Sequence, residues 1–166
     1  MGQKLTRGDI EKIQAEIDQR RIELRPQLTS AVAEAAAQGD RSENFEYYAA
    51  KKENNRNNSR IRYLQNVLRY AEVVEYAPEG EVGVDKEVTV YIPDDDEEET
   101  YLLVTPIRTN SLNNIVSIDS PLGKALMHHH VGDTVMIRVS ESYSYECEIR
   151  SVRPSEAAAA LDISEF

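Results

Sequence analysis

Residues 31–48 read AVAEAAAQGDRSENFEYY and interrupt a long helical pattern in their middle. Gly39 is a typical stop for the preceding helix, because glycine readily adopts the backbone conformation that ends helices. Asp40 is the predicted N-cap of the next helix, and Glu43 stands three residues later, in the position of a capping box. Two helices joined by so short a turn must lie antiparallel, so this stretch predicts a helical hairpin.

Residues 6–38 predict the first arm of that hairpin, because apolar residues recur there every seven positions. They are Ile10, Ile17, Leu24 and Ala31, flanked by Ile13, Leu28, Val32 and Ala35. Pro26 should bend or weaken this arm, since it lacks a backbone N–H. The second arm is expected from Asp40 to about Val74, with Tyr47, Tyr48, Ile61, Leu64, Leu68 and Ala71 on its buried side. An antiparallel coiled coil of roughly 45 to 50 Å follows from the helical rise.

After Glu75 the pattern changes from helical to alternating, which is typical of strands. The predicted strands are 86–92, 100–105, 114–118, 133–139 and 145–152, and a short helix is predicted over 121–127. The fold class is therefore α+β, with a small antiparallel sheet and one short helix after the hairpin. The predicted divisions are a hairpin over 1–75, a linker over 76–81, a sheet domain over 82–153 and a tail over 154–166.

The formal net charge of -11 is spread unevenly along the chain. Residues 1–72 carry a balance of +2, whereas residues 73–166 carry -13. The acidic half argues against a protein that binds free nucleic acid or anionic membranes, because such partners repel it. No apolar run approaches the roughly 20 residues of a membrane span, so we expect a cytoplasmic protein without a membrane partner. A single cysteine, Cys147, excludes an intrachain disulfide.

Most catalytic signatures are absent from the sequence, including a glycine-rich phosphate loop and a nucleophile elbow. The consecutive histidines 128–130 favour a solvent-facing loop over a metal site, because adjacent residues converge poorly on one ion. The acidic run 94–99 lacks the alternating ligands and internal glycine of a calcium loop, which favours an exposed hairpin turn.

The turn between the two helical arms contains two carboxylates, Asp40 and Glu43, with Ser42 and Asn44 beside them. The two acids could cap the second helix, or they could share a divalent ion held by another macromolecule. A basic flank follows, consisting of Lys51, Lys52, Arg56, Arg60, Arg62 and Arg69, with Glu53 as its acidic member. Such a flank is either a solvated helix face or a surface that faces phosphate.

Two segments resemble the signatures of one family. Arg25-Pro26, residues 31–35 and residues 39–47 (GDRSENFEY) resemble the tip region of the bacterial Gre transcript-cleavage factors, GreA and GreB. Residues 117–126 (SIDSPLGKAL), with 131–133 (VGD), resemble the second signature of that family. The resemblance covers residues 1 to about 153, and the amino-acid sequence of the tip region is closer to that of GreB.

The resemblance implies a coiled coil and a C-terminal domain of FKBP-like fold that docks on RNA polymerase. Docking is expected at Asp119, Ser120, Pro121 and Leu122. The coiled coil would enter the polymerase's secondary channel, where Asp40 and Glu43, supported by Ser42 and Asn44, would help hold a Mg²⁺ shared with the polymerase. The basic residues Lys51, Lys52, Arg56 and Arg60 would face the 3' end of the nascent RNA.

The function implied is transcription elongation: a factor that stimulates the polymerase's own cleavage of backtracked RNA and so rescues arrested complexes. By the same resemblance the protein would not be an enzyme, would have no cofactor of its own, would act as a monomer and would be classed with DNA-binding transcription proteins. The alternative is a regulator or inhibitor that occupies the channel without cleavage. An FKBP-like fold also suggests a peptidyl-prolyl isomerase, but fold alone does not carry function.

Overall fold

The computed structural model describes residues 2–39, 44–109 and 113–165. They form two compact units. The first unit contains residue 2 and residues 9–71, and the second contains residues 3–8 and residues from 72 onward. Within the described ranges, no helix combines the length and apolarity needed to cross a membrane.

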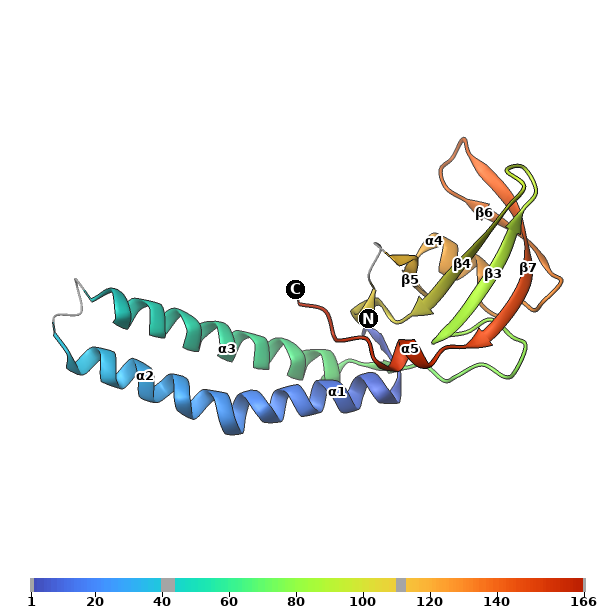
Figure 1. Cartoon of the computed structure of the whole chain (residues 1–166). Helices are drawn as coiled ribbons and strands as arrows, with labels where there is room; N and C mark the ends of the chain where they lie inside the picture. Colours follow the sequence, from blue (N-terminus) through green and yellow to red (C-terminus); the bar gives the residue numbers. More distant parts are fainter. Residues whose placement is uncertain (1, 40–43, 110–112, 166) are drawn as a thin grey trace. The chain divides into compact units, whose positions relative to one another are not determined.

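The first unit is a helical hairpin whose two arms lie side by side (Figure 1). The first arm consists of α1 (Arg7–Asp18), a π-helical segment (Gln19–Leu24) and α2 (Arg25–Ala37), and the second arm is α3 (Phe45–Arg69). The buried hydrophobic residues of the hairpin are Ile13, Ile17, Ala35, Ile61, Leu64 and Val67. The predicted hairpin is thus confirmed, with its fully buried residues concentrated in α1 and the C-terminal half of α3.

The first arm changes its hydrogen-bond register immediately before Pro26. The backbone N–H of Arg25 donates to the carbonyl of Arg20, five residues earlier, as in a π-helix. Pro26 has no N–H to donate to Ile22, four residues earlier, so an unbroken α-helical ladder cannot form at this point. The predicted weakening of the arm at Pro26 is therefore confirmed as a local π-helical segment.

The second arm begins at Phe45, and its N-cap is Asn44. The side-chain oxygen of Asn44 accepts a hydrogen bond from the backbone N–H of Tyr47 at 3.0 Å. The prediction that Asp40 caps this helix, with Glu43 completing a capping box, is therefore wrong. Asp40, Arg41, Ser42 and Glu43 lie outside the described residues, and α3 ends at Arg69, earlier than predicted.

The second unit is built on a five-stranded sheet with the order β5-β4-β3-β7-β6 (Figure 1). Its strands are β3 (Lys86–Ile92), β4 (Glu97–Val104), β5 (Ile115–Ser117), β6 (Thr134–Arg138) and β7 (Ser144–Pro154). The pairs β3–β4, β3–β7 and β6–β7 are antiparallel, but β4–β5 is parallel. The predicted strands are present, and the sheet is mixed where an antiparallel one was expected. The acidic run lies at the exposed β3–β4 turn, as predicted.

A second pairing joins two distant parts of the chain. The strand β1 (Lys4–Leu5) pairs in parallel with β2 (Glu72–Val73), which places residues 3–8 in the second unit. Each strand has only two residues, too few for an alternating pattern, so nothing in the sequence pattern indicates this pair.

The core of the second unit lies on one face of the sheet, with α4 (Pro121–Leu126) packed against it. Its buried members are Val82, Val84, Val88, Val90, Ile92, Leu103, Ile118, Leu126, Val135, Ile137, Cys147 and Ile149. Burial raises the pKa of the Cys147 thiol, which disfavours the reactive thiolate.

The C-terminal tail packs onto the second unit through a second, smaller cluster. The helix α5 (Glu156–Ala159) buries Ala158 against Val104 and Ile115. The guanidinium of Arg108, from a 3-10 turn (Pro106–Arg108), donates to the carbonyl of Ala158 at 2.9 Å and to the Asp85 carboxylate at 2.7 Å. Of the two states expected for the tail, the structure shows the short helix.

Candidate functional site

Asn44 joins the two arms of the hairpin at the end where Asp40 and Glu43 occur in the sequence. Besides capping α3, its side-chain N–H donates to the backbone carbonyl of Ala35 on the first arm at 2.5 Å. Since Ala35 is buried in the hairpin, this bond fixes the start of α3 against α2. Asn44 therefore attaches the start of α3 to the C-terminal part of α2.

All residues of the predicted basic flank except Arg60 are exposed on α3: Lys51, Lys52, Arg56, Arg62 and Arg69. Lys51 and Lys52 are exposed, and the Lys51 ammonium lies 5.9 Å from the centre of the Tyr47 ring. Arg56 is also exposed and forms an ion pair with Glu53 at 3.4 Å. An exposed pair of this kind is screened by water and contributes little to stability, so the Arg56 guanidinium is able to exchange partners.

Arg60 does not belong to the exposed flank, which corrects the prediction made from sequence. Its side chain is 6% exposed and lies inside the hairpin, where its guanidinium contacts both carboxylate oxygens of Glu16, at 2.8 and 3.3 Å. A buried guanidinium needs such a carboxylate, because an uncompensated charge in the interior is costly. The signal was present in the sequence: Arg60 is next to Ile61 and four residues before Leu64, on the apolar face of α3.

Glu16 is the centre of a polar network between the arms. It also accepts from Arg20 at 2.8 Å, and the Arg20 guanidinium donates to the Asn57 side chain at 3.0 Å. Burial raises the pKa of the Glu16 carboxyl, but hydrogen bonds from Arg60 and Arg20 outweigh burial and hold that pKa below its ordinary value. Glu16 is therefore a charged carboxylate at neutral pH, as its two arginine partners require.

Two aromatic side chains near the start of α3 are exposed. Phe45 is 89% exposed and Tyr48 is 52% exposed. The prediction that Tyr48 lies on the buried side of the hairpin is wrong. The neighbouring residue Tyr47 is half-buried, and its ring meets the Tyr48 ring edge to face, with centroids 5.4 Å apart.

The predicted docking segment, Asp119 to Leu122, connects β5 to α4. Asp119 forms an ion pair with Lys4 of β1 at 2.8 Å, so the segment is attached to the N-terminal strand. Ser120 caps α4, because its hydroxyl oxygen accepts from the backbone N–H of Gly123 at 3.0 Å. Pro121 is exposed, whereas Leu122 is half-buried against the core. Of the four residues, Pro121 is thus the one most accessible to a partner.

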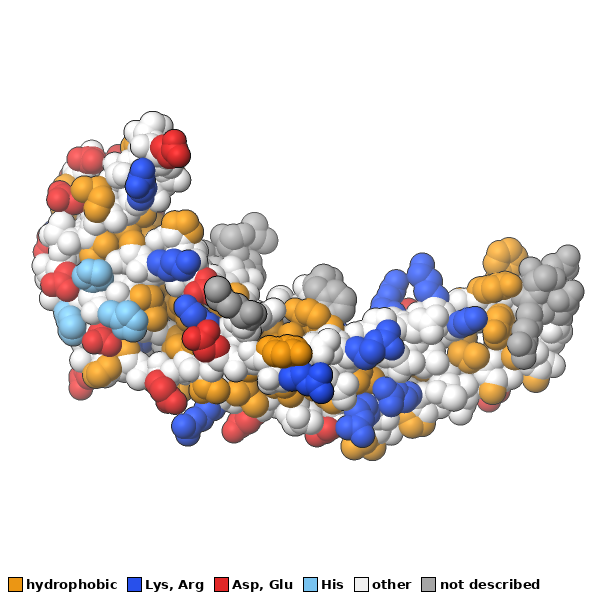
Figure 2. Space-filling view, turned by 180° about the vertical axis from the view of Figure 1, so that it is seen from behind, with side chains coloured by type: hydrophobic (Ala, Val, Ile, Leu, Met, Phe, Trp, Pro, Cys, Tyr) orange, Lys and Arg blue, Asp and Glu red, His pale blue; other side chains and the backbone are white. Residues whose placement is uncertain are grey.

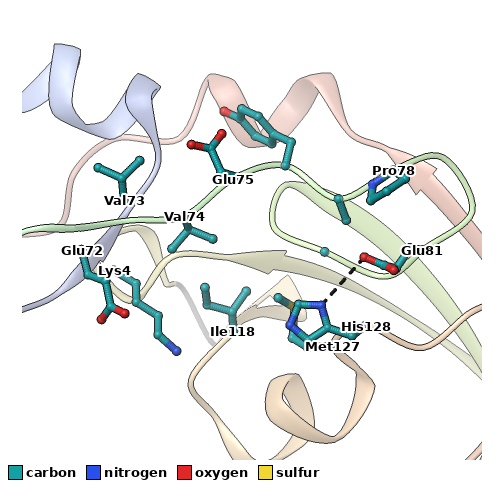
Figure 3. A pocket seen from close by; sticks show the side chains of 13 residues that line it. Lys4, Glu72, Val73, Val74, Glu75, Pro78, Glu81, Ile118, Met127 and His128 are labelled. Carbon is teal, nitrogen blue, oxygen red and sulfur yellow. Dashed lines mark ion pairs between the residues drawn. The ribbon is translucent and has the colours of Figure 1, made fainter.

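A pocket of about 410 Å³ lies next to this segment, within the second unit (Figure 3). Val74, Ile118 and Met127 contribute apolar lining, and charged side chains of both signs, including Lys4 and Glu81, stand among them. Sequence patterns did not identify this pocket, since its wall between 72 and 83 has neither helical nor alternating periodicity. An apolar pocket edged by charges suits a side chain from a protein partner.

The histidine loop forms the edge of this pocket on the side of Glu81. His128 lies 3.8 Å and His130 3.6 Å from the Glu81 carboxylate, and both histidines are exposed, as predicted for a solvent-facing loop. In residues 2–39, 44–109 and 113–165, no group of three or more His, Cys, Asp or Glu side chains could hold a metal ion.

Comparison with known proteins identifies the family of both units. Residues 3–73 match a family model described as transcription elongation factor, N-terminal. Residues 77–154 match one described as transcription elongation factor, GreA/GreB, C-term. These models give no support to the expected classification of the chain as DNA-binding.

Curated relatives extend over nearly the whole chain. The chain is 37% identical over 150 residues to transcription elongation factor GreA of Oenococcus oeni, covering 89% of this chain and 93% of that protein. It is 38% identical over 136 residues to transcription elongation factor GreA of Thermotoga neapolitana, covering 81% and 87%. A solved structure of the transcription factor Gfh1 is 26% identical, with 92% of this chain and 97% of that chain covered and a TM-score of 0.45.

The family models and the GreA relatives confirm the predicted family and the predicted stimulation of transcript cleavage by RNA polymerase. Members of this family have RNA polymerase as their partner and act by stimulating it, not by catalysing a reaction on their own. The chain belongs to the GreA/GreB family of transcription elongation factors, which stimulate transcript cleavage by RNA polymerase.

Proposed function

We propose that this chain rescues arrested RNA polymerase by carrying Asp40 and Glu43 into the polymerase active site through the secondary channel. In this proposal the second unit docks at the rim of the channel, and the hairpin extends down the channel to the polymerase active site. The protein acts as a monomer in the cytoplasm, and its substrate is the 3' end of backtracked nascent RNA.

The observation that carries the proposal is the assignment of the helix cap to Asn44. Asp40 and Glu43 had two readings, as caps of the second helix or as ligands of a shared metal. Asn44 accepts from Tyr47 N–H and so provides the cap of α3. Because α3 does not need Asp40 as its cap, this observation supports the metal-sharing role that we propose for the two acids.

The chemistry proposed for the two acids follows from their type. Carboxylate oxygens are the ligands that Mg²⁺ prefers, and a magnesium ion shared with the polymerase would stabilise the charge that develops on the cleaved phosphodiester. Asp40 and Glu43 would raise the occupancy of that weakly held ion and orient the attacking water. Asn44 would act as a positioning residue, because it fixes α3 against the carbonyl of Ala35.

The proposed docking surface is the segment 119–122 together with the neighbouring pocket. Pro121 is exposed, and the pocket offers an apolar lining of Val74, Ile118 and Met127. Its charged edge, with Lys4 and Glu81, would orient a partner side chain of either sign. We expect the polymerase to present an apolar side chain here, flanked by polar groups.

The sequence of the tip region, residues 39–47, also suggests a GreB-like member of the family. The two relatives named above are both called GreA. This finer assignment stays a proposal. It would be tested by the length of RNA released from complexes backtracked by different distances.

The experiment is a cleavage assay on a backtracked polymerase complex with wild-type protein, Asp40→Asn and Glu43→Gln. Both substitutions preserve side-chain size and remove charge, and α3 keeps its cap at Asn44. We expect the wild-type protein to accelerate cleavage and each variant to lose at least about tenfold of that acceleration, with unchanged helix content and melting temperature. Full activity of both variants would refute the catalytic role of the two acids. Slower cleavage with wild-type protein than without any added protein would favour the inhibitor alternative.

A further inference from the structure

Residues 155–165, which we call the tail segment, follow the part of the chain that the C-terminal family model matches. That match ends at residue 154. The tail segment contains α5 and still contacts the second unit (Figure 1). Ala158 is fully buried against this unit, and Leu161 packs on the same cluster. A segment outside the matched domain therefore occupies a defined place on that domain.

The surface beneath the tail segment is built by the matched domain itself. Its apolar part consists of Val104 from β4 and Ile115 from β5. Its polar part is the buried guanidinium of Arg108, which donates to the carbonyl of Ala158 at 2.9 Å and to the Asp85 carboxylate at 2.7 Å. Because Asp85 belongs to the domain, the charge of Arg108 is compensated without the tail segment. We call Val104, Arg108 and Ile115 the tail site.

The tail segment buries little of its own surface in return. Within residues 155–165, all of which the structure describes, Ala158 is the one buried residue and its side chain is a single methyl group. Ser155, Leu161 and Ile163 are half-buried, and the remaining side chains are exposed. The helix α5 has four residues, far too few to be stable as an isolated helix. The tail segment should therefore open locally while the sheet unit stays folded.

A preformed apolar surface with one buried donor is well suited to bind a peptide. We propose that the tail site is a peptide-binding site and that the tail segment is the ligand that occupies it in cis. The ligand class is a short peptide with a small side chain, a leucine three positions later and a main-chain carbonyl that accepts from Arg108, as at Ala158 and Leu161. Attachment to the chain gives the tail segment an effective concentration of about millimolar, so it excludes other peptides of this class while it is bound. The inference does not depend on the proposed function.

The first test asks whether the tail segment opens on its own, and it uses the unmodified chain. The backbone N–H of Ser155 donates to the carbonyl of Asp85 at 3.0 Å, and that of Ser164 donates to the carbonyl of Ile107 at 2.9 Å. Hydrogen exchange followed by NMR would compare these two amides with the hydrogen-bonded amides of β3, the central strand of the sheet. We expect the two tail amides to exchange at least about a hundredfold faster than those of β3. Equal protection would overturn the proposal, because the tail segment would then be a fixed part of the unit.

The second test measures binding of the ligand in trans to the full chain. Ala158→Asp should displace the tail segment, because a carboxylate at this fully buried position would lose its hydration. Ala157→Asp is the matched control, since Ala157 is the exposed neighbour. A fluorescent peptide with the sequence of residues 155–165 should bind the Ala158→Asp chain at least about tenfold more tightly than the wild-type or Ala157→Asp chain, in which the site is occupied. The same peptide with Ala158→Asp should bind none of the three chains.

The peptide is acidic, and Figure 2 shows Lys and Arg side chains along the hairpin that would attract it without specificity. Fluorescence anisotropy is therefore measured in about 0.5 M salt, which screens such contacts, and circular dichroism checks that each chain is folded. If the Ala158→Asp chain does not fold, Leu161→Asp, at a half-buried residue, takes its place. Equal binding of the peptide to all chains, or no binding to a folded variant, would overturn the proposal. Failure of both variants to fold would overturn it as well, since the tail segment would then be required for the fold.

Discussion

The hairpin and the sheet unit differ in how their side chains hold them together. Among the described residues, the sheet unit has one contiguous core of twelve buried hydrophobic residues, whereas six are buried along the hairpin. The hairpin compensates with polar contacts between its arms, centred on Glu16, Arg60 and Asn57. Hydrogen bonds and ion pairs are directional, so they set the register of two long arms that bury little apolar surface.

In the function that we propose, this difference gives the two units different roles. A long, thin hairpin suits a part that must reach into a confined site, because bulk would prevent its entry. A compact sheet unit provides a stable surface for docking. Mutations in the sheet unit should therefore act mainly on stability, and mutations at the far end of the hairpin mainly on activity.

The largest effect is expected in the core of the sheet unit. Leu103→Ala should lower the free energy of unfolding by about 2–5 kcal/mol, because Leu103 is fully buried and truncation leaves a cavity. Val139→Ala, at an exposed position of the same unit, should stay within about 0.5 kcal/mol of wild type. Denaturant unfolding followed by circular dichroism would measure both. Equal effects would show that the sheet core does not dominate stability.

A smaller effect is expected in the hairpin from Glu16→Gln, which leaves Arg60 buried without its carboxylate. We expect a loss of about 1–3 kcal/mol, since Glu16 is partly accessible to water, while Glu53→Gln at an exposed pair should change stability by less than about 0.5 kcal/mol. The measurement is the denaturant midpoint of each variant. A hairpin as tolerant of Glu16→Gln as of Glu53→Gln would contradict the role given to the polar network.

The same carboxylate gives the hairpin a pH dependence of defined sign. The pKa of Glu16 in the folded protein lies below its ordinary value of 4.5. Its contribution to stability is therefore present above pH 4.5 and is lost as the pH falls through the folded-state pKa. The stability difference between wild type and Glu16→Gln should thus narrow in acid, and a difference that is constant with pH would contradict the assignment.

The smallest stability effect is expected at Asn44. Asn44→Ala should lose the cap of α3, at about 1 kcal/mol, together with the bond to the carbonyl of Ala35. Asn44→Ser keeps a capping oxygen but lacks the amide N–H that reaches Ala35, so it should recover most of the stability. If Asn44 positions the acids, Asn44→Ser should still reduce stimulated cleavage. Full activity of Asn44→Ser would limit Asn44 to its capping role.

Much of this architecture follows from sequence periodicity, because periodicity reports which face of a long element is buried. The seven-residue repeat of the first arm and the alternation of 86–92 are long enough to define helix and strand. The two-residue strands β1 and β2 are too short for any period, so their parallel pairing was not predictable in this way.

The candidate site was harder to predict, because its details depend on contacts between the arms. A helix-start pattern made Asp40 a plausible cap, but Asn44 provides the cap and also reaches Ala35 on the other arm. Arg60 was assigned to the exposed flank by its charge alone, although its position on the apolar face indicated a buried partner. The charge of a residue indicates which chemistry its side chain could perform. Its position around the helix determines whether that side chain is exposed or buried.

The most direct test of the division between docking and chemistry is a competition experiment on a backtracked polymerase complex. The double variant Asp40→Asn with Glu43→Gln, added in excess to wild-type protein, should suppress stimulated cleavage, because it retains the docking surface and lacks the acids. Wild-type rates in the presence of excess folded double variant would contradict the account.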